Sequence, residues 1–208
     1  MSRDVEMERA VARASLYTLL SALFDRPLDA AGLAALRNPS VSAALAAVGI
    51  DLGQELSSVG AAELRERLSI EFSHIFIAPA GKVMPYEGLM IGGDDELSGD
   101  GAARVARFMA DVGYKLPPES GQVADHIAVE LAFMADLAGR EAAALSEADL
   151  PRATRAREIQ RDFLRQHLGC WCKVFANKVQ QRDGTGFYAV LATAVAAFVA
   201  SEIEIETV

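Results

Sequence analysis

The chain has 208 residues and a formal charge of −9, because 29 acidic residues outnumber 20 basic ones. That sign argues against a phosphate backbone as a ligand, so we expect no nucleic-acid partner. Hydrophobic residues make up 51% and charged residues 24% of the chain. This composition is typical of a folded globular protein whose core needs neither a metal nor a disulfide for stability.

The chain shows no sequence feature of export. Its two cysteines, Cys170 and Cys172, are too few and too close together for a disulfide framework, which predicts a reducing compartment. Residues 1–9 contain acids where a signal peptide needs a basic start and an apolar run. The longest apolar stretch, 187–200, is too short to cross a membrane as a helix. We therefore expect a cytoplasmic protein without membrane insertion.

Apolar residues recur at three- and four-residue steps along most of the chain, which predicts amphipathic helices. Residues 28–56 are interrupted by glycines and by Asn38-Pro39, so short helices joined by turns are expected there. No strand-like alternation of any length is present, and the sequence predicts a single all-α domain over residues 1–208. The longer predicted helices cover residues 4–25, 61–76, 102–112, 121–145, 149–180 and 186–204.

One long irregular loop is expected over residues 78–101, because eight prolines and glycines in this segment prevent a continuous helix. Loops of this length are usually functional or mobile, so the segment is a candidate binding element. A flexible connector is the alternative. The acidic residues 94–96 and Asp100 give the loop a negative charge that would either attract a cationic ligand or only keep the loop soluble.

The densest group of ionisable residues is Asp125, His126 and Glu130. On a helix, His126 and Glu130 share a face, a spacing suited to metal ligation or to acid–base pairing. A metal site needs at least one further ligand, and no second half-motif supplies it. Spacing alone favours a structural interpretation, in which Asp125 caps the helix and His126 forms an ion pair with Glu130.

A second group, His167, Cys170 and Cys172, does not converge from one helix, because only the first two residues share a face. An apolar stripe runs through the same segment, so we interpret the cysteines as small buried hydrophobes. The arginines between 152 and 165 alternate with acids and predict a solvated face. No nucleophile elbow or phosphate loop is present. The sequence thus indicates no catalytic residue, no metal and no cofactor.

Six motifs occur in a characteristic order along nearly the whole chain. They are Tyr17-x-x-Leu20-x-x-Leu23-Phe24, Glu71-Phe72-x-x-Ile75-Phe76, Met84-Pro85-Tyr86-Glu87, Asp125-His126-Ile-x-x-Glu130-Leu-x-Phe133-Met134, Phe163-Leu-x-x-His167-Leu-x-x-Trp171 and Phe187-Tyr188. With these motifs the chain resembles the TorD-like, or redox-enzyme maturation, family. Its members are cytoplasmic chaperones of molybdenum-cofactor oxidoreductases of the dimethyl-sulfoxide-reductase type. The chain departs from the family pattern at residues 122–124, which lack proline, and at Gly88, where a serine is usual.

The resemblance implies an all-helical chaperone, and not an enzyme, whose partner is a molybdoenzyme catalytic subunit. It would bind the client's N-terminal leader, commonly a twin-arginine signal peptide, and in some members the apo body during cofactor insertion, as a monomer or a homodimer. Paired arginines beside an apolar stretch require carboxylates beside apolar surface. On this basis Asp125 and Glu87 would supply charge, the aromatic residues would supply apolar contact, and His126 would orient Asp125. The expected peptide-binding residues are Phe72, Phe76, Tyr86, Glu87, Asp125, His126 and Glu130.

Two other classes of function stay open at this point. One is a helical enzyme that uses Asp125, His126 and Glu130 as metal ligands or acid–base groups. The other is a regulatory helical module that binds a protein unrelated to molybdoenzymes.

Overall fold

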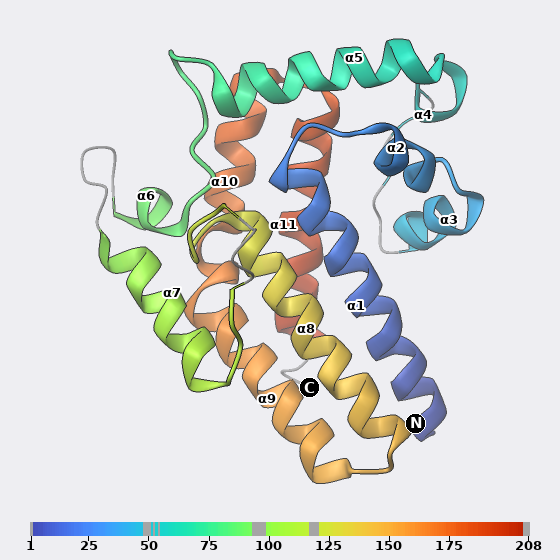
Figure 1. Cartoon of the computed structure of the whole chain (residues 1–208), viewed down its shortest axis with the longest axis vertical. Coiled ribbons are helices and arrows are strands. Elements are labelled where there is room, and N and C mark those ends of the chain that lie inside the picture. The colour runs from blue at the N-terminus through green and yellow to red at the C-terminus, as the bar shows by residue number, and fades with distance from the viewer. Residues whose placement is uncertain are drawn as a thin grey trace. The chain divides into compact units, whose positions relative to one another are not determined.

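The computed structural model describes residues 2–47, 51, 53, 55–92, 99–116 and 121–205. Within these ranges the chain forms eleven α-helices and one π-helical turn, η1, and no strand (Figure 1). The expected all-α class is therefore confirmed. The elements are α1 (Arg3–Asp25), α2 (Ala30–Leu36), α3 (Pro39–Ala47), α4 (Glu55–Ser58), α5 (Ala61–Phe72), η1 (Ser73–Ile77), α6 (Glu87–Ile91), α7 (Gly99–Asp111), α8 (Ile127–Ser146), α9 (Leu150–Gln166), α10 (Leu168–Asp183) and α11 (Phe187–Ile205).

The chain divides into two compact units, each made of two separate segments. The first unit comprises residues 1–22 and 86–170, and the second comprises residues 23–85 and 171–208. Each unit is therefore closed by residues that are distant in sequence. The expectation that residues 1–208 form a single domain stays a prediction.

Two differences from the expected helices have local causes. The pattern over 149–180 is two helices, because His167 leaves helical geometry with φ −131° and ψ −100° and separates α9 from α10. The helix expected from residue 121 begins only at Ile127, because His126 is extended and pairs with Tyr86 in an isolated antiparallel bridge. Both breaks lie at residues whose side chains belong to the site described below.

The long irregular loop expected over residues 78–101 is interrupted by helix. Residues 87–91 form α6, and α7 already begins at Gly99, so the expectation is wrong for these residues. The acidic residues 94–96 lie outside the described residues. Asp100, which is described, is exposed in the first turn of α7.

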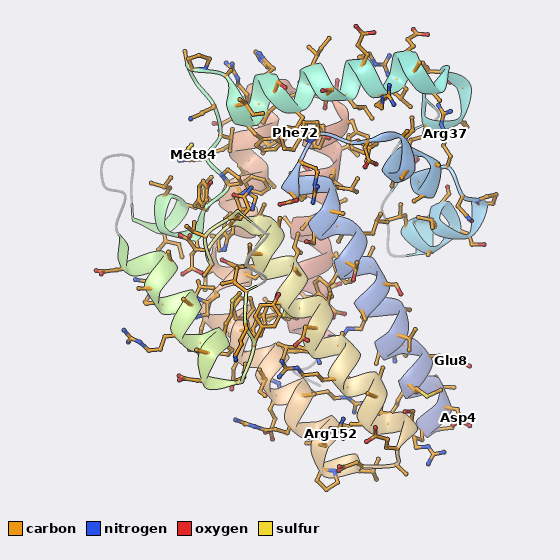
Figure 2. All side chains as sticks on the ribbon, in the orientation of Figure 1. Asp4, Glu8, Arg37, Phe72, Met84 and Arg152 are labelled. Carbon is orange, nitrogen blue, oxygen red and sulfur yellow. The ribbon has the colours of Figure 1, made fainter. Side chains whose placement is uncertain are left out.

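The first unit packs α1, α8 and α9 alongside one another (Figure 1). A buried polar network joins the three helices at Glu141, which is 2% exposed. Its carboxylate accepts hydrogen bonds from Arg157 Nε at 2.6 Å, Gln160 Nε2 at 2.9 Å and Arg13 Nη1 at 3.3 Å. Arg157 is thus an exception to the solvated face expected for the arginines of α9. Arg152, at the start of α9, does project outward (Figure 2).

The second unit has an aromatic core. Phe72 lies on the inner side of α5 (Figure 2), with its ring 4.9 Å from that of Phe76 and 5.3 Å from that of Tyr188. The Phe76 ring also packs against Phe175 at 6.3 Å and Phe24 at 6.2 Å. The Phe76–Phe175 pair is stacked and the other pairs are edge-on or tilted, and aromatic pairs of these kinds stabilise a core beyond the burial of their area.

By length and composition, residues 187–204 of α11 could cross a membrane, although 44% of that stretch is buried within the fold. Its buried residues recur at helical spacing on one face, as expected for a helix packed against a protein core. They include Tyr188, Leu191, Ala192, Val195 and Val199.

Glu71 of α5 caps the first turn of α11. Its Oε1 accepts a hydrogen bond from the Tyr188 backbone N–H at 2.7 Å, which satisfies one of the unpaired donors of a helix start. A side chain at Gly186 would lie 2.8 Å from the same oxygen and would collide with the carboxylate of Asp183. Burial raises the pKa of Glu71 to about 7, the Tyr188 N–H opposes this shift, and the nearby charge of Asp183 adds to it.

The raised pKa predicts a pH-dependent stability. The Glu71 carboxyl has a pKa of 4.5 when unperturbed, so its contribution is fully present below that pH and is lost as the pH rises through about 7. We expect the melting temperature of the wild type to fall over this range relative to that of Glu71→Gln. Thermal unfolding across pH measures the difference. Glu66→Gln, at an exposed position of α5, is the matched control. A Glu71→Gln profile parallel to the wild type would contradict the assignment.

Candidate functional site

The two sequence motifs with most site residues meet through their backbones in the first unit. Tyr86 and His126 form an antiparallel bridge, and the Glu87 N–H donates to the Asp125 carbonyl at 2.9 Å. The Gly88 N–H donates to Asp125 Oδ2 at 3.2 Å. We call this arrangement of residues 86–88 and 125–126 the Asp125 clasp. It brings together four of the seven expected site residues.

His126, and not Asp125, caps α8. Its Nδ1 accepts a hydrogen bond from the Ala128 N–H at 3.2 Å, so a neutral His126 carries its proton on Nε2. The expected cap at Asp125 is wrong, because Asp125 lies one residue too early and its carboxylate is bonded to Gly88. The cap also commits one ring nitrogen of His126. The Tyr86 ring covers the imidazole edge-on at 5.1 Å.

Glu87 is a buried carboxylate, 1% exposed. The His167 Nδ1 lies 3.0 Å from its Oε2 and 3.3 Å from its Oε1. Arg104 of α7 approaches Oε1 at 3.4 Å from a side chain that is 52% exposed. A charge taken out of water needs such partners, because desolvation otherwise outweighs what the fold gains.

Asp125 is 5% exposed, and its second carboxylate oxygen, Oδ1, has no hydrogen-bond partner among the described residues. Burial raises the pKa of its carboxyl above 3.8, the hydrogen bond from Gly88 lowers it, and the charge of Glu87 raises it. A buried acceptor of this kind is costly to leave unpaired. The clasp therefore holds a carboxylate in which only one of the two oxygens is hydrogen-bonded. Its burial also disfavours the charged form.

α7 approaches the clasp at Gly101, which is buried. A Cβ atom on Gly101 would lie 2.7 Å from Gly88 Cα and 3.2 Å from Asp125 Oδ2. The absence of a side chain at Gly101 thus lets two backbones come close enough to cover Asp125.

We expect Gly101→Ala to lower the free energy of unfolding by about 1–3 kcal/mol, the usual cost of overpacking. The matched control is Gly139→Ala in α8, where nothing lies within 4 Å of the new methyl group. That change should stabilise the protein by about 0.5–1 kcal/mol, the helix-propensity gain of alanine over glycine. Chemical denaturation measures both. Equal stabilisation by the two substitutions would show that Gly101 is not a close-packed contact.

The predicted site residues outside the clasp are Glu130, Phe72 and Phe76, and none of them is exposed. Glu130 is on α8, three residues beyond the start of the helix, and is 0% exposed. Phe72 is 5% exposed in the aromatic core of the second unit, and Phe76 is partly buried there. Tyr86 is partly exposed.

The cysteines differ in their surroundings. Cys172 is buried, as expected for a small hydrophobe, but Cys170 is exposed, and its Sγ donates to the Arg165 carbonyl. The expectation of a buried Cys170 is wrong, because Cys170 lies off the buried stripe formed by Leu168, Trp171 and Phe175. Across the part of the chain that the structure describes, no three His, Cys, Asp or Glu side chains group as metal ligands.

Sequence reasoning missed three contributors to the clasp. The sequence places His167 beside Cys170 and Cys172, whereas its partner Glu87 lies 80 residues away. Gly101 was counted as a helix breaker, although it belongs to α7. Val123, whose carbonyl accepts the His126 N–H, places an apolar side chain that is 52% exposed beside the clasp.

Two cavities in the second unit are lined by described residues. One, of about 420 Å³, is lined by residues of α5 and the start of α11, including Leu64, Leu68, Glu71 and Phe187. The other, of about 320 Å³, lies among α2, α3 and α4 and includes Leu36, Arg37 and Leu45. Neither is lined by a residue that the sequence analysis assigned to the site.

Comparison with known proteins places these features in context. Residues 38–177 match the family model described as "nitrate reductase delta subunit". The chain is 31% identical to the chaperone protein TorD of Salmonella bongori, covering 88% of this chain and 84% of the relative. It is 28% identical to the chaperone protein TorD of Vibrio parahaemolyticus, covering 89% and 90%. The fold is similar to that of a redox enzyme maturation protein from Archaeoglobus fulgidus, with a TM-score of 0.55, 22% identity and coverage of 90% and 93%.

Proposed function

We propose that this chain, which belongs to the nitrate reductase delta subunit family of TorD-like chaperones, binds the N-terminal leader of a molybdoenzyme catalytic subunit. Its relatives are named chaperones and not enzymes, so no residue is assigned to catalysis. The leader is of the twin-arginine type, and binding takes place in the cytoplasm before export. The apo body of the same client is the second partner, held while its cofactor is inserted.

The observation that supports leader binding most directly is Oδ1 of Asp125, a buried oxygen without a hydrogen-bond partner among the described residues, which a ligand reaches only when its cover opens. An arginine guanidinium donates up to five hydrogen bonds and carries the opposite charge, so it would satisfy this oxygen and relieve the cost of burying the carboxylate. Charge-assisted hydrogen bonds of this kind are about twice as strong as neutral ones. Asp125 is thus the acceptor that we assign to a leader arginine.

The apolar part of a leader requires apolar surface next to that acceptor. Tyr86 is partly exposed within the clasp, and Val123 is exposed immediately before it. We assign these two side chains to the apolar stretch of the leader. Phe72 and Phe76 stay sequence-based predictions, and a contact with Phe72 would require the aromatic core of the second unit to open.

Asp125→Ala should weaken leader binding while the chain stays folded, because His126 and not Asp125 caps α8. Loss of a hydrogen bond to a charged group costs about 1.5–3 kcal/mol, which raises the dissociation constant roughly ten- to a hundredfold. Calorimetry with a synthetic peptide that has paired arginines followed by an apolar stretch measures this change.

The control for this experiment is Asp162→Ala, at an exposed carboxylate of α9 in the same unit. It should leave the dissociation constant unchanged. A peptide with both arginines replaced by glutamine should bind the wild type as weakly as the arginine peptide binds Asp125→Ala. Wild-type affinity in Asp125→Ala would rule out the proposed acceptor.

Leader binding should also depend on pH, because the pKa of Asp125 is raised by burial. A guanidinium binds the carboxylate and not the protonated acid, so protons compete with the leader. We expect affinity to fall as the pH drops through this raised pKa, by at most about tenfold per pH unit for one proton. Asp125→Asn should bind weakly with no such slope. An identical slope in the variant would assign the titration to another group.

A further inference from the structure

Glu87 has a different environment from Asp125. Its side chain is 1% exposed, and both of its carboxylate oxygens lie within 3.3 Å of His167 Nδ1. We propose that Glu87 and His167 are a positioning pair, which holds residues 86–88 so that Oδ1 of Asp125 stays unpaired and available to the leader once the site opens. This inference rests on the proposed function. It replaces the expected role of Glu87 as a direct contact of the leader.

The position of His167 is fixed independently of Glu87. The residue lies at the non-helical junction of α9 and α10, and its backbone N–H still donates to the Phe163 carbonyl at 2.9 Å. Its ring packs against Phe163 at 5.1 Å and Phe108 at 5.4 Å. Because backbone and ring are both held, the hydrogen bond from Nδ1 sets where the Glu87 carboxylate lies.

Glu87 transmits this position to Asp125 through its backbone. Its own N–H donates to the Asp125 carbonyl at 2.9 Å, and the next N–H, that of Gly88, donates to Asp125 Oδ2 at 3.2 Å. The side chain of Glu87 is therefore held by His167 while its backbone holds Asp125. Since Gly88 occupies Oδ2, the oxygen left for a ligand is Oδ1.

Arg104 contacts the same carboxylate without the same constraint. It reaches Glu87 Oε1 at 3.4 Å from a side chain that is 52% exposed. The guanidinium end of this pair is exposed, so water screens it, and holding the long side chain costs entropy. Arg104 is therefore not a positioning residue, and it provides a matched control at the same carboxylate.

The test compares three variants of the full chain. His167→Leu removes the donor at similar volume, His167→Asn keeps an N–H donor close to the position of Nδ1, and Arg104→Gln removes the exposed contact. The first readout is the dissociation constant for the twin-arginine peptide. The second is the amide NMR shift of Gly88 without peptide, which reports the hydrogen bond to Asp125.

We expect His167→Leu to raise the dissociation constant about tenfold, near the lower end of what a hydrogen bond to a charge is worth. The Gly88 amide signal should move with it. His167→Asn and Arg104→Gln should stay within about twofold of wild type and keep the Gly88 signal. A purely structural His167 would lower the melting temperature of His167→Leu without moving either readout, and that result would overturn the proposal.

Loss of His167 alone leaves a buried carboxylate without its donor, which can prevent folding. In that case the double variant Glu87→Leu/His167→Leu replaces the single variant in the test, because it removes both partners and leaves no unpaired charge at this pair. An unmoved Gly88 amide in this variant would equally overturn the proposal. If the wild type binds no twin-arginine peptide, the proposed function fails, whereas the Gly88 amide still decides whether Glu87 and His167 position the clasp.

Discussion

The backbone pairing of residues 86–88 with residues 125–126 is the constraint on which the candidate site depends. It joins two segments at points where each has left helical geometry, so the hydrogen bonds that a helix would have satisfied internally are made across the chain instead. Because α8 starts immediately after this pairing, the pairing also fixes where its first turn begins. Two elements of the first unit thus take their starting positions from one short backbone contact.

The carboxylates of Glu87 and Asp125 lie close together in this arrangement, and they differ in their hydrogen-bond partners. The buried carboxylate of Glu87 is paired with the imidazole of His167 and the guanidinium of Arg104, so we assign it a structural role. Asp125 accepts a hydrogen bond from the Gly88 N–H, whereas its buried Oδ1 has no hydrogen-bond partner among the described residues. A buried acid that lacks a hydrogen-bond donor at one oxygen, beside one that has its donors, is typical of a binding site, where the ligand supplies the missing donor. The charge of Glu87 also makes Asp125 more costly to ionise.

Much of the helical fold could be predicted from apolar spacing, because the buried stripes of α5, α8 and α11 are regular. The break at His167 could not, since the stripe Leu164, Leu168, Trp171 and Phe175 continues at helical spacing straight through it. The cap of α8 was ambiguous, because Asp125 and His126 are adjacent and both side chains can accept a backbone N–H. Motif resemblance selected residues of the clasp, but the pairing of Glu87 with His167 depends on tertiary geometry that no local pattern encodes.

The division of the first unit into two distant segments has a consequence for biosynthesis. Arg13 of α1 bonds Gln160 of α9, and the two residues are 147 positions apart. At about 5–20 residues per second, the ribosome needs roughly 7–30 s between making one and making the other. Until α8 and α9 have been made, the apolar face of α1 lacks the partners that it contacts within its own unit. A protein of the chaperone family thus passes through a period in which its own N-terminal helix is exposed to aggregation.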